Sequence, residues 1–114
     1  MISLFRKDKL HTSFRGKQRI LTPGIQSEVP PFFANYLWNY IDALSLETYS
    51  LAHLLHFQIE KADGLCYINF SQEAPHQKEQ FSLRLFEDDL LPNEILVVNS
   101  RYEQKMILPE EYQM

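Results

Sequence analysis

Few residues of this 114-residue chain have the types and spacing of a catalytic or metal site. His53 and His56 lie three positions apart, but side chains three apart on a strand point to opposite faces, and no third ligand is evident nearby. Cys66 has no histidine or basic residue beside it in sequence, so it is interpreted as a small buried hydrophobic residue. The acidic run Glu87-Asp88-Asp89 lacks the spacing of a calcium loop and is typical of a solvated turn. We therefore expect neither metal nor cofactor.

A different chemistry, the binding of phosphate groups, is suggested by the uneven charge. The net charge is −4, yet residues 1–19 sum to +5 and the remainder to −9. A basic arm on an acidic body can bind nucleic acid through its phosphates, fold against that body or stay solvated. The candidate nucleic-acid contacts are the basic residues that precede residue 18, namely Arg6, Lys7, Lys9, Arg15 and Lys17.

Length and composition place the rest of the chain in one ordinary domain, residues 18–114, preceded by the basic arm at residues 1–17. No apolar run approaches the roughly 20 residues that a membrane helix needs, and the N-terminal residues lack an apolar signal core. A single cysteine cannot form an internal disulfide. We expect a cytoplasmic protein that makes no membrane contact.

The most regular element is an amphipathic helix that begins at Pro31. The proline at this position keeps Pro30 extended, and its own fixed φ suits the first helical residue. Apolar residues then recur at helical spacing at Phe33, Tyr36, Leu37, Tyr40, Ile41 and Leu44. No capping Ser, Thr, Asp or Asn precedes this helix, so its first N–H groups need Gln26, water or an anion as acceptor.

The rest of the sequence predicts strands. An extended segment at residues 18–22 ends at a Pro23-Gly24 turn. Runs of apolar residues, several of them alternating with polar ones, favour further strands over residues 55–60, 65–71, 81–86, 95–98 and 105–108. An Asp63-Gly64 hairpin turn joins the first two of them. We therefore expect an α+β domain with one main amphipathic helix packed on a mostly antiparallel sheet of about five or six strands.

Trp38 does not fit the apolar stripe of the helix. At 100° per residue it lies roughly 130° from the centre of that stripe, close to Asn39 and Asp42. Either the basic arm or the loop at residues 45–50 covers the indole, or the indole is a contact for another protein, where tryptophan is favoured.

Three groups of residues, which we call islands, carry a resemblance to a known family. They comprise Arg19, Thr22, Gly24, Gln26, Pro30, Leu37, Trp38, Ile41 and Asp42 in the first, Ser71, Gln72, Glu73 and Pro75 in the second, and Glu110, Glu111 and Tyr112 in the third. On these islands the chain resembles the bacterial domain-of-unknown-function family 960, small proteins of Gram-positive bacteria, some carried on mobile genetic elements. The resemblance implies an α+β fold and no assigned activity. Pro23 stands where the family tends to have an arginine, so no anion-binding role carries over to it.

Many island residues are polar or aromatic where a core would need apolar ones, so we expect some islands to converge at a surface near Trp38. A partner protein or a second copy of the chain would cover that surface. The residues expected to bind it are Gln26, Trp38, Asp42, Gln72, Glu73, Glu111 and Tyr112. The sequence thus favours a non-enzymatic protein-binding or regulatory module. The alternatives are a nucleic-acid-associated protein that uses the basic arm, and an unrecognised enzyme with its site at Gln26, Gln72 and Glu110.

Overall fold

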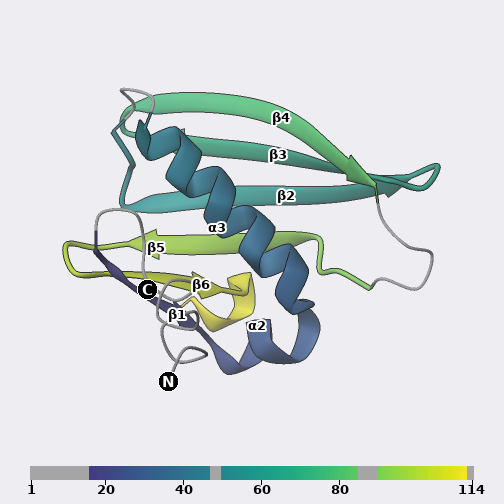
Figure 1. The fold of residues 1–114 in the computed structure, drawn as a ribbon, viewed down its shortest axis with the longest axis horizontal. Coiled ribbons are helices and arrows are strands. Elements are labelled where there is room, and N and C mark those ends of the chain that lie inside the picture. Colours follow the sequence, from purple (N-terminus) through teal and green to yellow (C-terminus); the bar gives the residue numbers. More distant parts are fainter. Residues whose placement is uncertain (1–15, 47–49, 85–89, 113–114) are drawn as a thin grey trace, which may run out of the picture.

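The computed structural model describes residues 16–46, 50–84 and 90–112, which form one sheet with a helix across it. In chain order the elements are β1 (Gln18–Leu21), α2 (Pro23–Glu28), α3 (Pro31–Leu46), β2 (Leu54–Ala62), β3 (Leu65–Glu73), β4 (His76–Arg84), β5 (Glu94–Asn99), β6 (Glu103–Ile107) and the 3₁₀ helix η1 (Pro109–Glu111). The six strands lie in the order β1-β6-β5-β2-β3-β4 (Figure 1), and all neighbours are antiparallel except β1 and β6. The predicted α+β class is confirmed.

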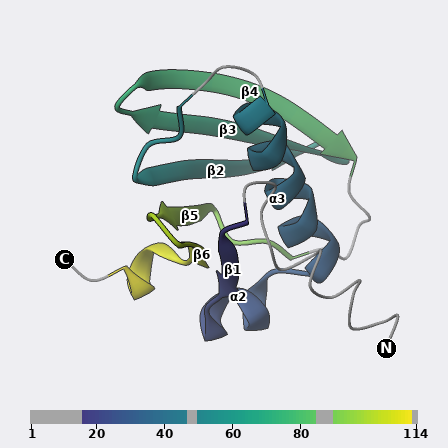
Figure 2. The same ribbon diagram turned by 60° about the vertical axis from the view of Figure 1, so that its left-hand side comes forward.

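α3 lies diagonally across one face of the sheet (Figures 1 and 2), and the core fills the space between them. It begins at Pro31 as predicted, and its side chains Phe33, Leu37 and Ile41 are fully buried. The sheet opposes them with Leu55, Phe57, Ile68, Phe70, Ile95 and Val97. Burying each of these side chains contributes roughly 1.5–3 kcal/mol. Neither α3 nor any other helix in the described ranges is long and apolar enough to cross a membrane.

The segment between β1 and α3 is a short helix, not the predicted turn. Thr22 caps α2, because its Oγ1 accepts a 3.4 Å hydrogen bond from the N–H of Ile25. Pro23 takes the first helical position, where the missing N–H costs nothing. The side chain of Gln26 turns back toward β1 instead of the start of α3, and its Nε2 donates to the carbonyl of Leu21 at 2.9 Å.

β2 and β3 are joined by the predicted hairpin turn. Asp63 and Gly64 both have positive φ, 54° and 78°, and Ala62 pairs with Leu65 across them. A two-residue turn with left-handed residues matches the twist of the strands, and aspartate and glycine tolerate that conformation. The prediction of this turn is confirmed.

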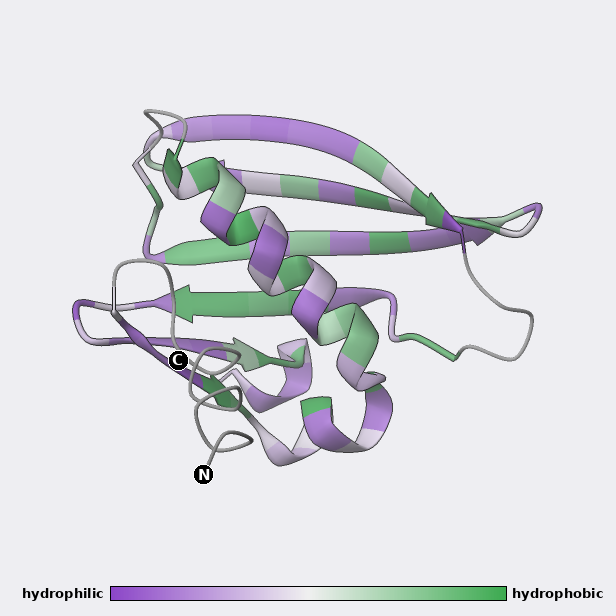
Figure 3. Cartoon of the chain, viewed as in Figure 1, coloured by the Kyte–Doolittle hydropathy of each residue, from purple (hydrophilic) through white to green (hydrophobic). Residues whose placement is uncertain are grey.

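β4 is longer than the sequence predicts. It begins at His76, after a turn with a cis Ala74-Pro75 peptide bond, whereas apolar alternation indicated a start at residue 81. Residues 76–80 are polar on both faces (Figure 3), so they give no periodic signal, yet they pair with β3 back to Glu73. Polar residues are tolerated there because β4 lies at the edge of the sheet and α3 covers its inner side only in part.

The face of the sheet opposite α3 is polar along β2, β3 and β4. Its side chains there include His56, Gln58, Glu60, Asn69, Ser71, Lys78, Gln80, Ser82 and Arg84. Burial on one face only is usual for antiparallel sheets. We call this side the open face.

Candidate functional site

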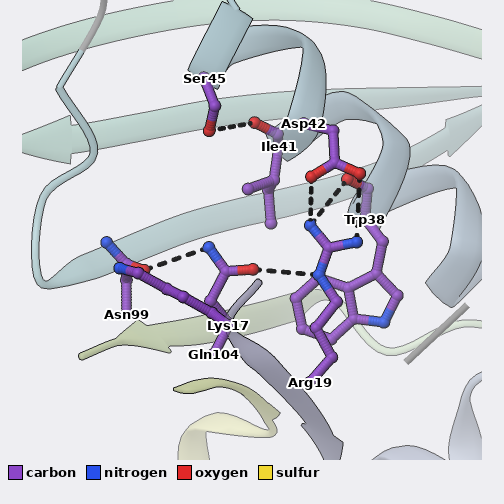
Figure 4. A network of polar contacts seen from close by, with 8 residues as sticks. All are labelled: Lys17, Arg19, Trp38, Ile41, Asp42, Ser45, Asn99 and Gln104. Carbon is purple, nitrogen blue, oxygen red and sulfur yellow. Dashed lines mark hydrogen bonds and ion pairs between the residues drawn. The ribbon is translucent and has the colours of Figure 1, made fainter. Parts of the chain in front are cut away.

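Arg19 on β1 joins two residues of the first island on α3 (Figure 4). Its guanidinium donates to both carboxylate oxygens of Asp42, from Nη2 to Oδ1 at 2.6 Å and from Nη1 to Oδ2 at 3.2 Å. Nη2 also donates to the carbonyl of Trp38 at 3.4 Å, and the guanidinium carbon lies 4.6 Å from the centre of the indole ring. A planar fork that pairs with a carboxylate and stacks on a ring is a property of arginine, not of lysine.

Trp38 is buried within its own chain, so of the two alternatives from the sequence the one in which an intramolecular contact covers the indole holds. Its exposed fraction is 2%. The physical reason is that α3 buries two flanks: Leu37 faces the core, while Arg19 from the edge strand β1 covers the indole. Arg19 belongs to neither of the two segments that the sequence suggested as a cover.

A chain of buried amides continues from Arg19 toward the loop before β2. Arg19 Nε donates to Gln104 Oε1 at 3.0 Å, and Gln104 Nε2 donates to Asn99 Oδ1 at 3.1 Å. Asn99 then donates to the carbonyl of Ala52 at 3.2 Å and accepts from Lys17 Nζ at 2.9 Å. No buried side-chain nitrogen or oxygen within the described ranges lacks a partner, so this network is a satisfied structural one.

Gln72, in the second island, is 3% exposed and fixes the same loop. Its Oε1 accepts from the N–H of Ala52 and its Nε2 donates to the carbonyl of Ser50, both at 2.9 Å. An inward amide can satisfy loop backbone that has no strand partner. Gln72 therefore holds residues 50–52 in place and does not face a surface, unlike its neighbour Glu73, which is exposed.

Glu111 joins the third island to the first. Its carboxylate accepts hydrogen bonds from Thr22 Oγ1 at 2.6 Å, Gly24 N–H at 2.9 Å and Leu108 N–H at 3.0 Å. The bond from Thr22, followed by those from the two backbone groups, lowers the pKa of this carboxyl below its usual 4.5, although desolvation opposes the shift. Gly24 permits the contact, because a Cβ at this position would lie 2.6 Å from Glu111 Oε1.

One pair of islands, the first and the third, thus shares contacts, but these contacts are internal and do not build one exposed surface. Of the predicted partner-binding residues, Gln26 and Glu73 are exposed on different elements, Asp42, Glu111 and Tyr112 are half-buried, and Trp38 and Gln72 are buried. Their use in partner binding stays a prediction. Of the predicted nucleic-acid contacts, Arg6, Lys7, Lys9 and Arg15 lie outside the described residues, and Lys17 is bonded to Asn99.

The open face brings together three residue types of a nucleophilic site that the sequence did not connect. His56 Nε2 contacts the Glu94 carboxylate, and Ser71 Oγ lies 3.5 Å from His56 Nδ1, beside a shallow groove of about 420 Å³. The distance is long for a hydrogen bond, and Ser71 lies mid-strand, where its N–H belongs to the ladder and cannot stabilise an oxyanion. No three His, Cys, Asp or Glu side chains of the described residues are grouped to hold a metal. Only strand register, which pairs His56 with Ser71, reveals this arrangement.

The outer edge of β4 is a further feature that the sequence did not indicate. β4 has nine residues, and β3 is its one neighbour in the sheet. Along an antiparallel pair, the backbone N–H and C=O groups of successive residues point alternately toward the neighbouring strand and away from it. Ile59 donates to the carbonyl of Asn93 on the β5 side at 2.7 Å, so the even-numbered residues of β2 bond to β3.

The same alternation continues across the sheet. The backbone groups of the odd-numbered residues of β3 point to β2, and those of its even-numbered residues point to β4. The even-numbered residues of β3 therefore bond to the odd-numbered residues of β4. The backbone N–H and C=O groups of Lys78, Gln80 and Ser82 therefore point away from the sheet. Within the described part of the chain no strand accepts them.

Comparisons with known proteins agree with this fold. A family model, DUF960, described as a staphylococcal protein of unknown function, matches residues 18–111. The crystal structure of a protein of unknown function from Enterococcus faecalis is similar, with a TM-score of 0.77 and 23% sequence identity over 86% of this chain and 92% of that chain. At this identity the likeness shows the fold alone. A search of curated proteins found no match.

Proposed function

The chain belongs to the DUF960 family, and from that premise we propose that it is a non-enzymatic protein-binding module whose contact is the outer edge of β4. An extended segment of a partner protein lies beside β4 and continues the sheet. Strand addition is a recurrent mode of recognition, in which main-chain hydrogen bonds give affinity and alternate side chains give specificity.

The length of the unpaired edge is the observation that carries this proposal. Strands are usually about 5–6 residues long, and exposed edges are commonly kept shorter or interrupted because they recruit other strands. β1, at the opposite edge, follows this rule with four residues. β4 does not, because its nine residues are all paired to β3 and none of its outward groups meets another described strand.

The side of β4 that faces α3 offers apolar surface to an added strand. Phe81 stacks on Tyr40 with 4.1 Å between ring centres and lies 5.9 Å from the ring of Tyr36. Phe81 and Leu83 are nevertheless only partly buried. Every second side chain of an added strand lies next to this apolar surface of Phe81 and Leu83. Burial there contributes roughly 25 cal/mol per Å² of apolar surface.

Glu79, on the same side of β4, does not close the edge. Inward-pointing charges protect many natural edge strands from pairing. Here the hydroxyl of Tyr40 donates to the Glu79 carboxylate and holds it against α3. The next two positions on this side, Phe81 and Leu83, remain available for contact.

Selection of random peptides on the folded protein tests the proposal. Peptides of about ten residues are expected to bind with Kd values of about 1–100 μM and to slow hydrogen exchange of the Gln80 and Ser82 amides. Ser82→Pro removes one outward N–H and spares the ladder to β3, so it should weaken binding at least ~10-fold. Ser82→Ala keeps that N–H and is the matched control.

Two results would contradict the proposal. The first is that the selected peptides perturb NMR signals on another surface and leave β4 unchanged. The second is that Ser82→Pro and Ser82→Ala bind the peptides equally well. Similar urea midpoints for the two variants would show that any loss of binding comes from the edge and not from unfolding.

A further inference from the structure

We infer that the segment bound by β4 comes from a different protein and alternates acidic with apolar residues. This depends on the proposed function, because it specifies the side chains of a strand that the β4 edge accepts. The two sides of β4 impose two different requirements on that strand.

On the open face, β4 presents a basic row at the edge of the sheet. Lys78 and Arg84 are exposed, and neither makes a hydrogen bond or ion pair with any residue of the described ranges. The other positions of this row are His76, Gln80 and Ser82, so it contains no acid. Directly opposed side chains of paired strands have Cβ atoms about 4.5–5.5 Å apart, and opposite charges there are favourable.

None of the acidic residues in the described ranges forms an ion pair with Lys78 or Arg84. Glu73 lies beside His76 at the β3–β4 turn, with 3.7 Å between Oε2 and Nδ1, and Glu79 points to the α3 side. Glu60 and Glu94, which share the open face, belong to β2 and β5, and β3 separates them from β4. An incoming carboxylate opposite Lys78 or Arg84 therefore gains an ion pair and displaces none that the described residues form.

The other side of β4 requires apolar residues. Phe81 and Leu83 lie two positions apart on that side and are partly buried, and Phe81 contacts the ring of Tyr36. Successive side chains of a strand point to opposite faces. A strand that places acidic residues beside the basic row and apolar residues beside Phe81 and Leu83 must therefore alternate acidic and apolar residues along its length.

A second copy of the chain is a poor occupant of the same edge. In a two-fold antiparallel pairing, opposed residues share a face, so the pairing is centred on one residue. A centre at Gln80 places Lys78 of each copy diagonal to Arg84 of the other, and a centre at Phe81 places these residues directly opposite. A centre at Glu79 opposes two carboxylates. Like charges directly opposite are destabilising, so the registers centred at Phe81 and Glu79 are disfavoured, while the register centred at Gln80 gains no pair of opposite charges in the basic row.

Synthetic peptides of equal length test the inference on the whole chain. In each peptide valine alternates with glutamate, serine or lysine. At low salt we expect the glutamate peptide to bind about tenfold more tightly than the serine peptide, since each of two exposed ion pairs adds a few-fold. Near 1 M salt, where the Debye length is about 3 Å, the difference should shrink. Fluorescence anisotropy gives the affinity, and slowed amide exchange at Gln80 and Ser82 gives the location.

Charge reversal supplies a matched control. The double variant Lys78→Glu/Arg84→Glu should reverse the order of affinity, so that the lysine peptide binds more tightly than the glutamate peptide. The double variant Arg101→Glu/Lys105→Glu changes the net charge equally, but it alters β6 and the turn before it, several strands from β4. It should leave the order of affinity unchanged.

The outcomes separate the two proposals. Equal affinity of the glutamate and serine peptides for β4, or a symmetric dimer in solution that pairs β4 with itself, overturns the inference and leaves the binding edge standing. Absence of slowed exchange in β4 with every peptide overturns both.

Discussion

Arg19 donates to Asp42 and covers the ring of Trp38, so one guanidinium pairs a half-buried carboxylate and shields an indole on the polar flank of α3. Its side chain is 3% exposed, which makes the ion pair less screened than a surface pair. Breaking buried ion pairs by removing one partner is strongly destabilising. Position 19 is therefore sensitive to the shape of the cation as well as its charge.

Replacing Arg19 by lysine tests this dependence. Arg19→Lys keeps the charge but loses the two-point contact with Asp42 and the flat contact with Trp38, so the free energy of unfolding should fall by about 1–3 kcal/mol. Urea titration followed by fluorescence measures it, because Trp38 is the one tryptophan of the sequence. Arg101→Lys, at an exposed position, is the control and should change stability by less than ~0.5 kcal/mol. Equal effects of the two substitutions would refute a special role for Arg19.

Glu111 predicts a pH dependence of stability. Hydrogen bonds from Thr22, Leu108 and Gly24 lower the pKa of this carboxyl in the folded state. A group with a lowered folded-state pKa stabilises the protein above its unfolded pKa, near 4.5, and this contribution is lost as the pH falls through the folded-state pKa. The stability difference between the wild type and Glu111→Gln should therefore be largest near neutral pH and shrink below 4.5.

Urea titrations from about pH 7 to about pH 3 measure this difference. Glu110→Gln, at the exposed neighbouring position, is the control and should show little change with pH. A constant deficit for Glu111→Gln over the whole range would mean that its charge does not matter.

At the scale of elements, Glu111 joins η1 to α2 through a contact that only glycine permits at position 24. In the wild type, Gly24→Ala places a Cβ 2.6 Å from Glu111 Oε1 and should cost about 1–3 kcal/mol by displacing the carboxylate. In a Glu111→Ala background the obstacle is gone, and alanine becomes neutral or stabilising by up to ~1 kcal/mol through its higher helix propensity. A double-mutant cycle in urea measures this change of sign, and additive effects would exclude the contact.

α3 buries two flanks, and substitutions on both should be costly. Leu37→Ala is expected to lower the free energy of unfolding by about 2–5 kcal/mol and Trp38→Ala by about 3–5 kcal/mol, since both side chains leave cavities. Phe32→Ala removes a ring that is 45% exposed from the same helix and should cost far less. Circular dichroism during urea unfolding compares all three variants. A small loss for Trp38→Ala would restore the idea that the indole serves a partner.

Locally determined elements were predictable from the sequence. Pro31 marks the start of α3 through its own φ, and Asp63-Gly64 forms a turn through left-handed residues, so neither needs the rest of the fold. α2 and the first half of β4 were missed for opposite reasons. α2 depends on the Thr22 cap and a distant carboxylate, while residues 76–80 are held in a strand by the β3 ladder despite having no apolar face.

At the scale of the molecule, the internal contacts of the island residues could not be predicted because their partners are distant in sequence. Arg19 meets Gln104 and Thr22 meets Glu111, and no periodicity predicts such pairs. Polar residues inside a fold look like a binding surface when only the sequence is read. The candidate edge had the reverse problem: β4 has no motif, and its exposure follows from strand order, which puts the fourth strand of the chain at the rim.

The pairing of β1 with β6 has a consequence for synthesis on the ribosome. Arg19 and Gln104 are 85 residues apart, and translation at about 5–20 residues per second takes roughly 4–17 s to span that distance. Throughout that interval β1 lacks β6, the one strand that pairs with it among residues 16–46, 50–84 and 90–112. For seconds the nascent chain therefore carries a strand without its partner, and Arg19, which contacts α3, lacks its bond to Gln104. This time is long enough for chaperones to bind the chain before β6 emerges and completes the sheet.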